Sequence, residues 1–174
     1  MSTPSPMTDA TRAIARFHAY AAAFEAAYES GDWSLLEPYF TADATSELNG
    51  ARVDGRAGVL ASFRDAVAMF DRRFDTRQLR ITAGPTFEDG RVHITAVARY
   101  ERESLAPLEL IGKEWFTFEG DRIKHHVDRV LNGAEIMGYL AAHADALRPF
   151  PAETSQPITP PTRPDAATAD TRGG

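Results

Sequence analysis

Apolar positions recur with one spacing in the first half of the chain and with another in the second half. Up to about residue 70 they return every three or four positions, which is typical of helices with one buried face. From about residue 79 they alternate with polar positions, which is typical of strands with one buried face. Helices followed by long strands predict an α+β fold, with the helices on one side of a curved sheet.

Three helices are expected before the long strands. The first runs from about Asp9 to Gly31, the second is short and spans Trp33 to Phe40, and the third begins near Gly55. The apolar stripe of the first helix is Ile14, Phe17, Ala21, Phe24 and Tyr28, and that of the third is Val59, Leu60, Phe63, Val67 and Phe70. A last helix is expected over about residues 134–147, and a weak strand over residues 43–48.

The long strands are expected to form two hairpins. Asp89-Gly90 ends a strand of residues 79–87, in which Pro85 indicates an edge position or a bulge, and starts a strand of residues 92–101. The second hairpin spans residues 108–131 and turns at Gly120. Its two arms are the stretch around which the rest of the chain is organised.

This second hairpin places charged groups among apolar ones. By the period of two, Glu114 shares a face with Gly112 and Phe116 on the first arm, and His126 shares a face with Asp128 on the second. A charge on a core-facing strand costs several kcal/mol unless it is paired or neutralised. Either the face is more hydrated than the pattern indicates, or it is the floor of a ligand pocket with acid–base groups.

Composition and charge narrow the class of protein. The 174 residues fit one domain with 43% hydrophobic and 25% charged residues, which are ordinary globular values. A net charge of −6 argues against a nucleic-acid or anionic-membrane partner. The chain has no Cys, no long apolar segment and no nucleotide-binding motif, so we expect a cytoplasmic protein that needs no cofactor.

The two ends differ from the middle. We expect residues 1–10 to be a flexible N-terminal segment, residues 11–148 to be the folded domain, and residues 149–174 to be a disordered tail. The tail is rich in Pro, Thr and Ala and offers almost no apolar anchors.

Four runs of sequence carry a resemblance to a known family. They are GDWSLLEPYFTADA, DGRAGVLASF, EDGRVHITAVARY and EWFTFEGDRIKHHVD, and they resemble the SnoaL-like branch of the nuclear transport factor 2-like superfamily. The resemblance covers roughly Ala13 to Leu140. It implies a cone of three N-terminal helices packed on a strongly curved antiparallel sheet, with a pocket at the open end and a short C-terminal helix. Polyketide cyclases, ketosteroid isomerase, scytalone dehydratase and limonene epoxide hydrolase share this fold, so it specifies the reaction poorly.

The resemblance assigns a role to Asp128. It stands where cyclases and the epoxide hydrolase of this superfamily carry a general acid or base. Glu114 would form an acid and base pair with it, because two close carboxylates do not both ionise cheaply. His126 would orient Asp128 or relay a proton, and the Tyr100 phenol would donate to a carbonyl. Each also has a structural interpretation: an ion pair for Asp128, a solvated edge for Glu114, and core packing for His126.

Further residues are expected to form the wall of the pocket. They are Tyr39, Ser46, Ala96, Ala98, Phe116 and Val130, although core packing is the simpler interpretation for Tyr39. Ala96 and Ala98 stand where the epoxide hydrolase type has an Arg and a second Asp, which disfavours that mechanism and leaves room for a bulky, flat substrate. A metal site of Glu114, His126 and Asp128 is disfavoured, because no second His shares the face.

Together these features predict a cofactor-free acid–base enzyme of the cyclase or isomerase type. It would remove a proton next to the carbonyl of an apolar cyclic or polyketide-like small molecule, with Asp128 as the base. The alternative is a non-catalytic small-ligand binding or interaction domain of the same fold. A homodimer is also expected, because Val97, Trp115, Thr117 and Val127 share the outer face of the sheet and would otherwise be an exposed apolar patch.

Overall fold

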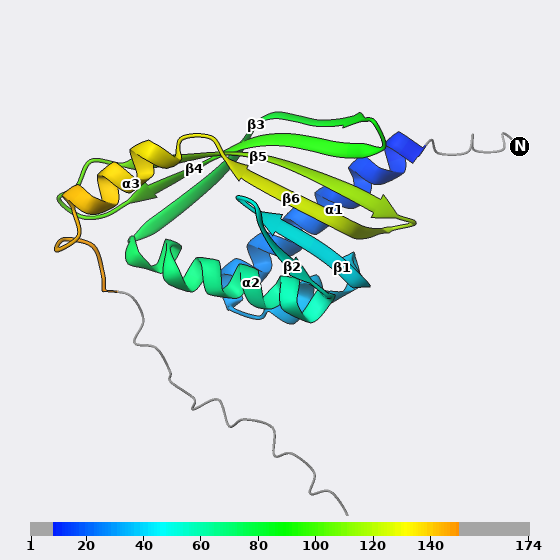
Figure 1. Cartoon of the computed structure of the whole chain (residues 1–174), viewed down its shortest axis with the longest axis horizontal. Coiled ribbons are helices and arrows are strands. Elements are labelled where there is room, and N and C mark those ends of the chain that lie inside the picture. Colours follow the sequence, from blue (N-terminus) through cyan, green and yellow to red (C-terminus); the bar gives the residue numbers. More distant parts are fainter. Residues whose placement is uncertain (1–8, 150–174) are drawn as a thin grey trace, which may run out of the picture.

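A computed structural model describes residues 9–149, which form helices packed against one six-stranded sheet (Figure 1). Most of the expected flexible N-terminal segment and nearly all of the expected disordered tail lie outside the described residues. In chain order the elements are α1 (Asp9–Ser30), the 3₁₀ helix η1 (Trp33–Tyr39), β1 (Phe40–Leu48), β2 (Ala51–Asp54), α2 (Arg56–Met69), the 3₁₀ helix η2 (Asp71–Arg73), β3 (Thr76–Glu88), β4 (Arg91–Glu101), β5 (Leu108–Glu119), β6 (Arg122–Val130) and α3 (Gly133–Ala142).

The helices differ in detail from the expected ones. The second is a 3₁₀ helix whose first turn is capped by Asp32, which accepts a hydrogen bond from the Ser34 backbone N–H. The short helix η2 was not expected, and α3 ends at Ala142 rather than near residue 147. No helix among residues 9–149 is both long enough and apolar enough to cross a membrane.

The sheet has the strand order β2-β1-β6-β5-β4-β3 and is mixed rather than wholly antiparallel. β1 pairs with β6 in parallel, while every other pair of neighbours is antiparallel. A parallel pair needs a long crossover, and here the chain from β2 to β5 supplies it. In Figure 1, β1 and β2 turn away from the other strands toward α2, which gives the sheet its strong curvature.

The core lies between α1, α2 and the inner face of the sheet. On β4 the expected alternation is found, since Val92, Ile94, Ala96, Ala98 and Tyr100 are all buried. The buried face of α1 is rotated from the expected stripe, with Ala13, Phe17, Tyr20 and Ala27 inside and Ile14, Ala21, Phe24 and Tyr28 only half-buried. The rotation arises because α1 is rich in Ala on several sides, so the sequence pattern leaves its inward face poorly defined.

The buried residues form two clusters instead of one continuous core. The larger lies between α1, η1, α2 and the strands and includes Phe17, Phe40 and Phe116. The smaller lies toward α3 and includes Phe74, Tyr100 and Ile136. Side chains of both clusters line a common cavity.

Candidate active site

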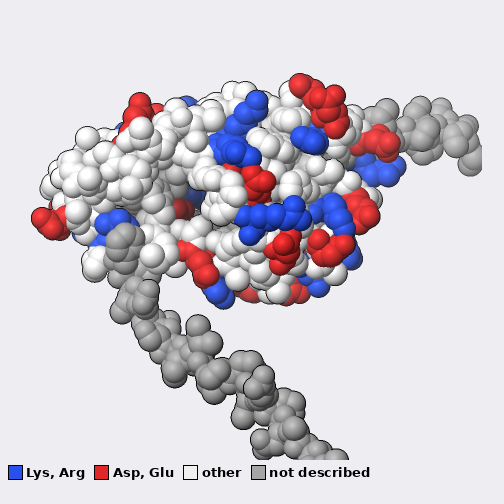
Figure 2. Space-filling model, in the orientation of Figure 1, with Lys and Arg blue, Asp and Glu red and all other residues white. Residues whose placement is uncertain are grey.

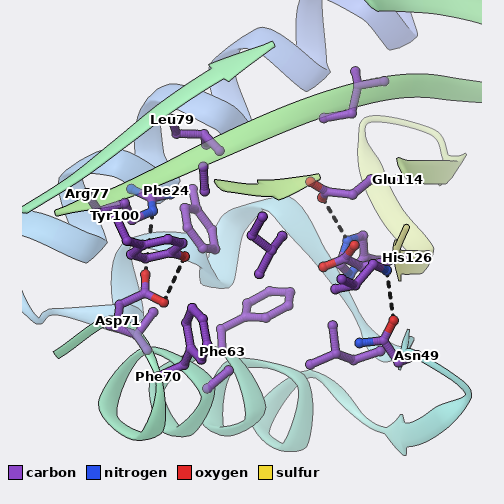
Figure 3. A pocket seen from close by; sticks show the side chains of 18 of the residues that line it. Phe24, Asn49, Phe63, Phe70, Asp71, Arg77, Leu79, Tyr100, Glu114 and His126 are labelled. Atoms are coloured by element: carbon purple, nitrogen blue, oxygen red, sulfur yellow. Dashed lines mark hydrogen bonds and ion pairs between the residues drawn. The ribbon is translucent and has the colours of Figure 1, made fainter. Parts of the chain in front are cut away.

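A cavity of about 1030 Å³ opens between the two core clusters. Its wall is mainly apolar and includes Phe24, Phe63 and Ile94 (Figure 3). Four lining residues are exposed large apolar side chains: Leu48, Met69, Leu79 and Met137. Figure 2 shows few charged side chains over α3, the helix that carries Met137. A drug-sized apolar molecule fits a space of this size and lining.

Strand pairing brings three of the expected site residues to one end of this cavity. Glu114 on β5 is the direct partner of Asp128 on β6, and Phe116 is the partner of His126. Glu114, Asp128 and His126 all line the cavity. The register therefore turns Glu114 inward, where a shift of one residue would have turned it to the outer face.

A chain of hydrogen bonds links Ser46, His126 and Glu114. The Ser46 hydroxyl lies 2.9 Å from His126 Nδ1, and His126 Nε2 lies 3.2 Å from Glu114 Oε2. A neutral imidazole satisfies both contacts when the hydroxyl donates to Nδ1 and the Nε2–H donates to the carboxylate. The imidazole also stacks on Phe116, with ring centroids 4.8 Å apart, so its plane is fixed from two sides.

Asp128 differs from its neighbours because one of its carboxylate oxygens has no partner. Among residues 9–149, nothing donates a hydrogen bond to the buried Oδ1. Burial, and then the charge of Glu114, raise the pKa of Asp128 to about 7, while His126 acts in the opposite direction. Such a carboxyl group is half-ionised near neutral pH and directed at a cavity, which is the condition for a general base.

The backbone around Asp128 is fixed by the turn between β1 and β2. Asn49, in a left-handed conformation at φ 50°, donates its backbone N–H to the Asp128 carbonyl at 2.9 Å. Its side-chain oxygen accepts from the Val130 backbone N–H at 2.8 Å. On the neighbouring strand, a Cβ at Gly112 would lie 3.4 Å from Asp128 Oδ1, so glycine there leaves the space beside this oxygen open.

Tyr20 on α1 lines the same cavity and was not expected from the sequence. Burial, and then the charges of Glu114 and Asp128, raise the pKa of Tyr20 well above its usual range. Its hydroxyl therefore keeps its proton and serves as a donor at any ordinary pH. The spacing of α1 alone could have placed Tyr20 inward with Phe17, since the two are three residues apart.

Tyr100 is not part of this group, although the sequence led us to expect it there. It lies six residues along β4 from Ile94, the partner of Glu114. Its hydroxyl donates to Asp71 Oδ1 at 3.0 Å, and Asp71 Oδ2 lies 3.5 Å from Arg77 Nε. Figure 3 shows Tyr100, Asp71 and Arg77 on one side of the cavity and Glu114 with His126 on the other. Burial raises the pKa of Asp71 to about 6, against the effects of Arg77 and Tyr100.

The expected wall residues divide into two groups. Ala98, Phe116 and Val130 line the cavity as expected. Tyr39, Ser46 and Ala96 are not among its lining residues. The Tyr39 ring lies under the Arg16 guanidinium, Ser46 contacts His126 from behind, and Ala96 is packed in the larger core cluster. Among the described residues, no group of three His, Cys, Asp or Glu is arranged to hold a metal ion.

Comparison with known proteins identifies both a family and a fold. The SnoaL-like domain family matches residues 9–126. No curated protein matches the chain. Among solved structures, Bal32a from a soil-derived mobile gene cassette is 18% identical, with a TM-score of 0.58, and the match covers 76% of this chain and 98% of Bal32a.

Two further structures come from bacteria. A protein from Jannaschia sp. CCS1, proposed to be a SnoaL-like polyketide cyclase, is 12% identical with a TM-score of 0.58, covering 82% of this chain and 99% of that one. An LEH-like epoxide hydrolase of M. tuberculosis is 16% identical with a TM-score of 0.56. The match covers 79% of this chain and 96% of that one. Identities this low indicate a shared fold, while the reaction has to be argued from the site.

Proposed function

Because the chain belongs to the SnoaL-like domain family, we propose that it is a cofactor-free acid–base enzyme of the cyclase or isomerase type. It removes a proton next to the carbonyl of an apolar cyclic or polyketide-like small molecule. One observation carries this proposal: the unpartnered, buried Oδ1 of Asp128, whose pKa is raised to about 7, at one end of a cavity of about 1030 Å³. Buried carboxyl groups with a raised pKa at the wall of a cavity are typical of catalytic sites.

The reaction follows from the protonation states at this end of the cavity. Ionised Asp128 takes the proton, so that a C–H bond breaks, an O–H bond forms on its carboxylate, and the electron pair moves to the carbonyl oxygen as an enolate. Tyr20 is the candidate donor to that oxygen, because its hydroxyl keeps its proton. The charge of Glu114, which is held by His126, raises the pKa of Asp128 and so makes it a stronger base.

The rest of the site supports an apolar substrate. The exposed residues Leu48, Met69, Leu79 and Met137 give the entrance an apolar rim, across which a hydrophobic molecule passes easily. Epoxide hydrolysis with an Arg and a second Asp on β4 is disfavoured, because Ala96 is in the core and Ala98 offers no polar group to the cavity.

Hydrogen–deuterium exchange at carbon tests the proposal without knowledge of the natural substrate. The protein is incubated in D₂O with 2-tetralone and 2-acetyl-1-tetralone, and proton NMR follows the loss of signal next to the carbonyl. We expect exchange above the buffer rate, rising with pH through about 7 as Asp128 ionises. Asp128→Asn should lower it about a hundredfold or more, in line with the usual contribution of a general base.

Asp121→Asn is the matched control, since Asp121 is an exposed acid in the turn between β5 and β6. It should exchange the probes at the wild-type rate. Binding of both probes with exchange no faster than in buffer would overturn the enzymatic proposal and favour the ligand-binding domain instead.

A further inference from the structure

The cavity has a second polar end, which the proposed reaction does not use. Asp71, Arg77, Tyr100 and Glu25 all line it there, and they come from η2, β3, β4 and α1. Arg77 donates from Nη1 and Nη2 to the two Glu25 oxygens at 3.0 and 3.1 Å. In Figure 3 the side chains of Phe24 and Phe63 lie between this group and Glu114, so the two polar ends are separated by an apolar middle.

The second group is desolvated. The side chains of Arg77 and Asp71 are only 6% and 11% exposed. Charged groups are rarely withdrawn from water to this extent unless they pair with one another or meet a polar ligand. Here they pair, and they also border a cavity large enough for a further molecule.

The group retains hydrogen-bonding capacity toward the cavity. The Tyr100 hydroxyl uses its proton on Asp71, which leaves its oxygen able to accept. Of the five N–H groups of Arg77, those on Nη1 and Nη2 not used by Glu25 have no hydrogen-bond acceptor among residues 9–149. Asp71 oxygens can each accept once more. A group that both donates and accepts, such as a hydroxyl, satisfies these partners best.

The spacing of the two ends sets the shape of the ligand. Tyr100 and Ile94, the partner of Glu114, are six residues apart on β4, which corresponds to about 20 Å along an extended strand. The side chains at both polar ends project into the cavity, so the distance between their polar atoms is shorter than this distance along the strand. A compact single ring does not reach both, whereas an elongated molecule of several rings does.

We propose that Asp71, Arg77 and Tyr100 form a second binding subsite, which holds a hydroxyl group at the far end of an elongated, otherwise apolar substrate whose carbonyl lies at Asp128. The inference rests on the proposed function for the orientation of the ligand. It adds a second anchoring point for that substrate, a hydroxyl group held far from the reacting carbonyl. Tyr100 is then a specificity-determining residue and takes no part in the proton transfer.

A matched pair of probes tests the subsite. 6-Phenyl-2-tetralone and 6-(4-hydroxyphenyl)-2-tetralone share one skeleton and one carbonyl and differ only in the terminal hydroxyl. Isothermal titration calorimetry should give about tenfold tighter binding of the hydroxylated probe to the wild type, as expected for one hydrogen bond to a charged group. Tyr100→Phe and Asp71→Asn should each abolish this preference and leave the affinity for the phenyl probe unchanged.

Tyr139→Phe is the control, because the Tyr139 hydroxyl donates to the Ala106 carbonyl and the residue does not line the cavity. It should keep the wild-type preference. Equal affinity of the wild type for the two probes would overturn the subsite, and so would an equal loss of both affinities in Tyr100→Phe and Asp71→Asn, which would indicate a structural role only.

Deuterium exchange of the same two probes separates this inference from the proposed function. Exchange without a preference for the hydroxylated probe overturns the subsite alone. A preference that depends on Tyr100 and Asp71 but comes without exchange supports the subsite and overturns the base role of Asp128.

Discussion

At the scale of single residues, Asp128 is held in a state that opposes folding. Its pKa is 3.8 in a solvated chain and about 7 in the folded protein, because burial and the charge of Glu114 disfavour the ionised form. The folded state therefore keeps a proton on Asp128 over a pH range in which the unfolded state has released it. Stability linked to this group is fully present below pH 3.8 and is lost as the pH rises through about 7.

This linkage predicts a measurable pH dependence. Asp71, with a pKa raised to about 6, contributes a fall of the same sign at lower pH, and His125, with a lowered pKa, contributes a rise, so the contribution of Asp128 is the difference between wild type and Asp128→Asn. The free energy of unfolding should fall by about 1 kcal/mol between pH 6 and pH 8 because of Asp128, and Asp128→Asn should remove that fall. Urea denaturation at the two pH values measures it, with Asp121→Asn as the control. An equal fall in wild type and Asp128→Asn would mean that the carboxyl group is solvated.

The sequence placed some site residues well and missed others for physical reasons. Glu114, His126 and Asp128 could be grouped because a strict alternation on two arms of a hairpin leaves only the register open. Tyr20 was missed because several sides of α1 are apolar enough to face inward. Asp71 and Arg77 were missed because they lie at junctions, in η2 and at the start of β3, where no periodic pattern assigns a face.

At the scale of elements, β4 has two functions along one face. Ile94 and Ala98 line the cavity, while Ala96 between them is buried in the larger core cluster without being a lining residue. Both alanines are buried, but only Ala98, a member of the smaller core cluster, also borders the cavity.

Enlarging each alanine should separate these surroundings. Ala98→Leu should fill part of the cavity and weaken binding of 6-phenyl-2-tetralone, with little change in stability, because the added atoms enter empty space. Ala96→Leu should lower the free energy of unfolding by about 1–3 kcal/mol, since added methyl groups strain a packed core. Calorimetric binding and urea denaturation of both variants measure the two effects. A loss of stability in Ala98→Leu together with a loss of binding in Ala96→Leu would contradict the position of the cavity.

The elements themselves were largely predictable, apart from η2, β2 and the pairing of β1 with β6. The turns at Asn49-Gly50, Asp89-Gly90 and Gly120 fall where the sequence indicates, because residues there adopt positive φ angles that glycine and Asn tolerate. The four-residue strand β2 was not predicted, because it is short and mostly exposed. The parallel pairing of β1 with β6 has no local signal, since it depends on where a distant strand ends up.

At the scale of the whole molecule, the sheet face opposite the cavity carries a partly exposed apolar patch. Val97, Trp115 and Thr117 are half-buried, Val127 is buried, and none of the four belongs to either core cluster of the described residues. Trp115 contacts side chains of its own face, stacking with His93 at a centroid distance of 6.4 Å. A second copy of the chain, related by a twofold axis, would cover this patch.

We therefore predict a homodimer through this face. Sedimentation equilibrium at micromolar concentration should give twice the 19.1 kDa mass of the chain. Trp115→Glu should give the mass of one chain, because it places a charge in the interface. Leu35→Glu, at an exposed apolar position of η1, is the control and should stay dimeric. A single-chain mass for the wild type would contradict the prediction.

The parallel pairing of β1 with β6 also predicts an order of folding. Ser46 and His126 are 80 residues apart in the chain, whereas β3 to β6 follow one another as hairpins. Because contacts between distant segments form slowly, we expect the hairpins to form early and β1 to join them late on the folding pathway. The hydrogen bond from Ser46 that orients His126 therefore exists only after this late step. Under the proposed function, a chain in which β1 has not yet paired lacks the oriented imidazole, and we expect it to be inactive.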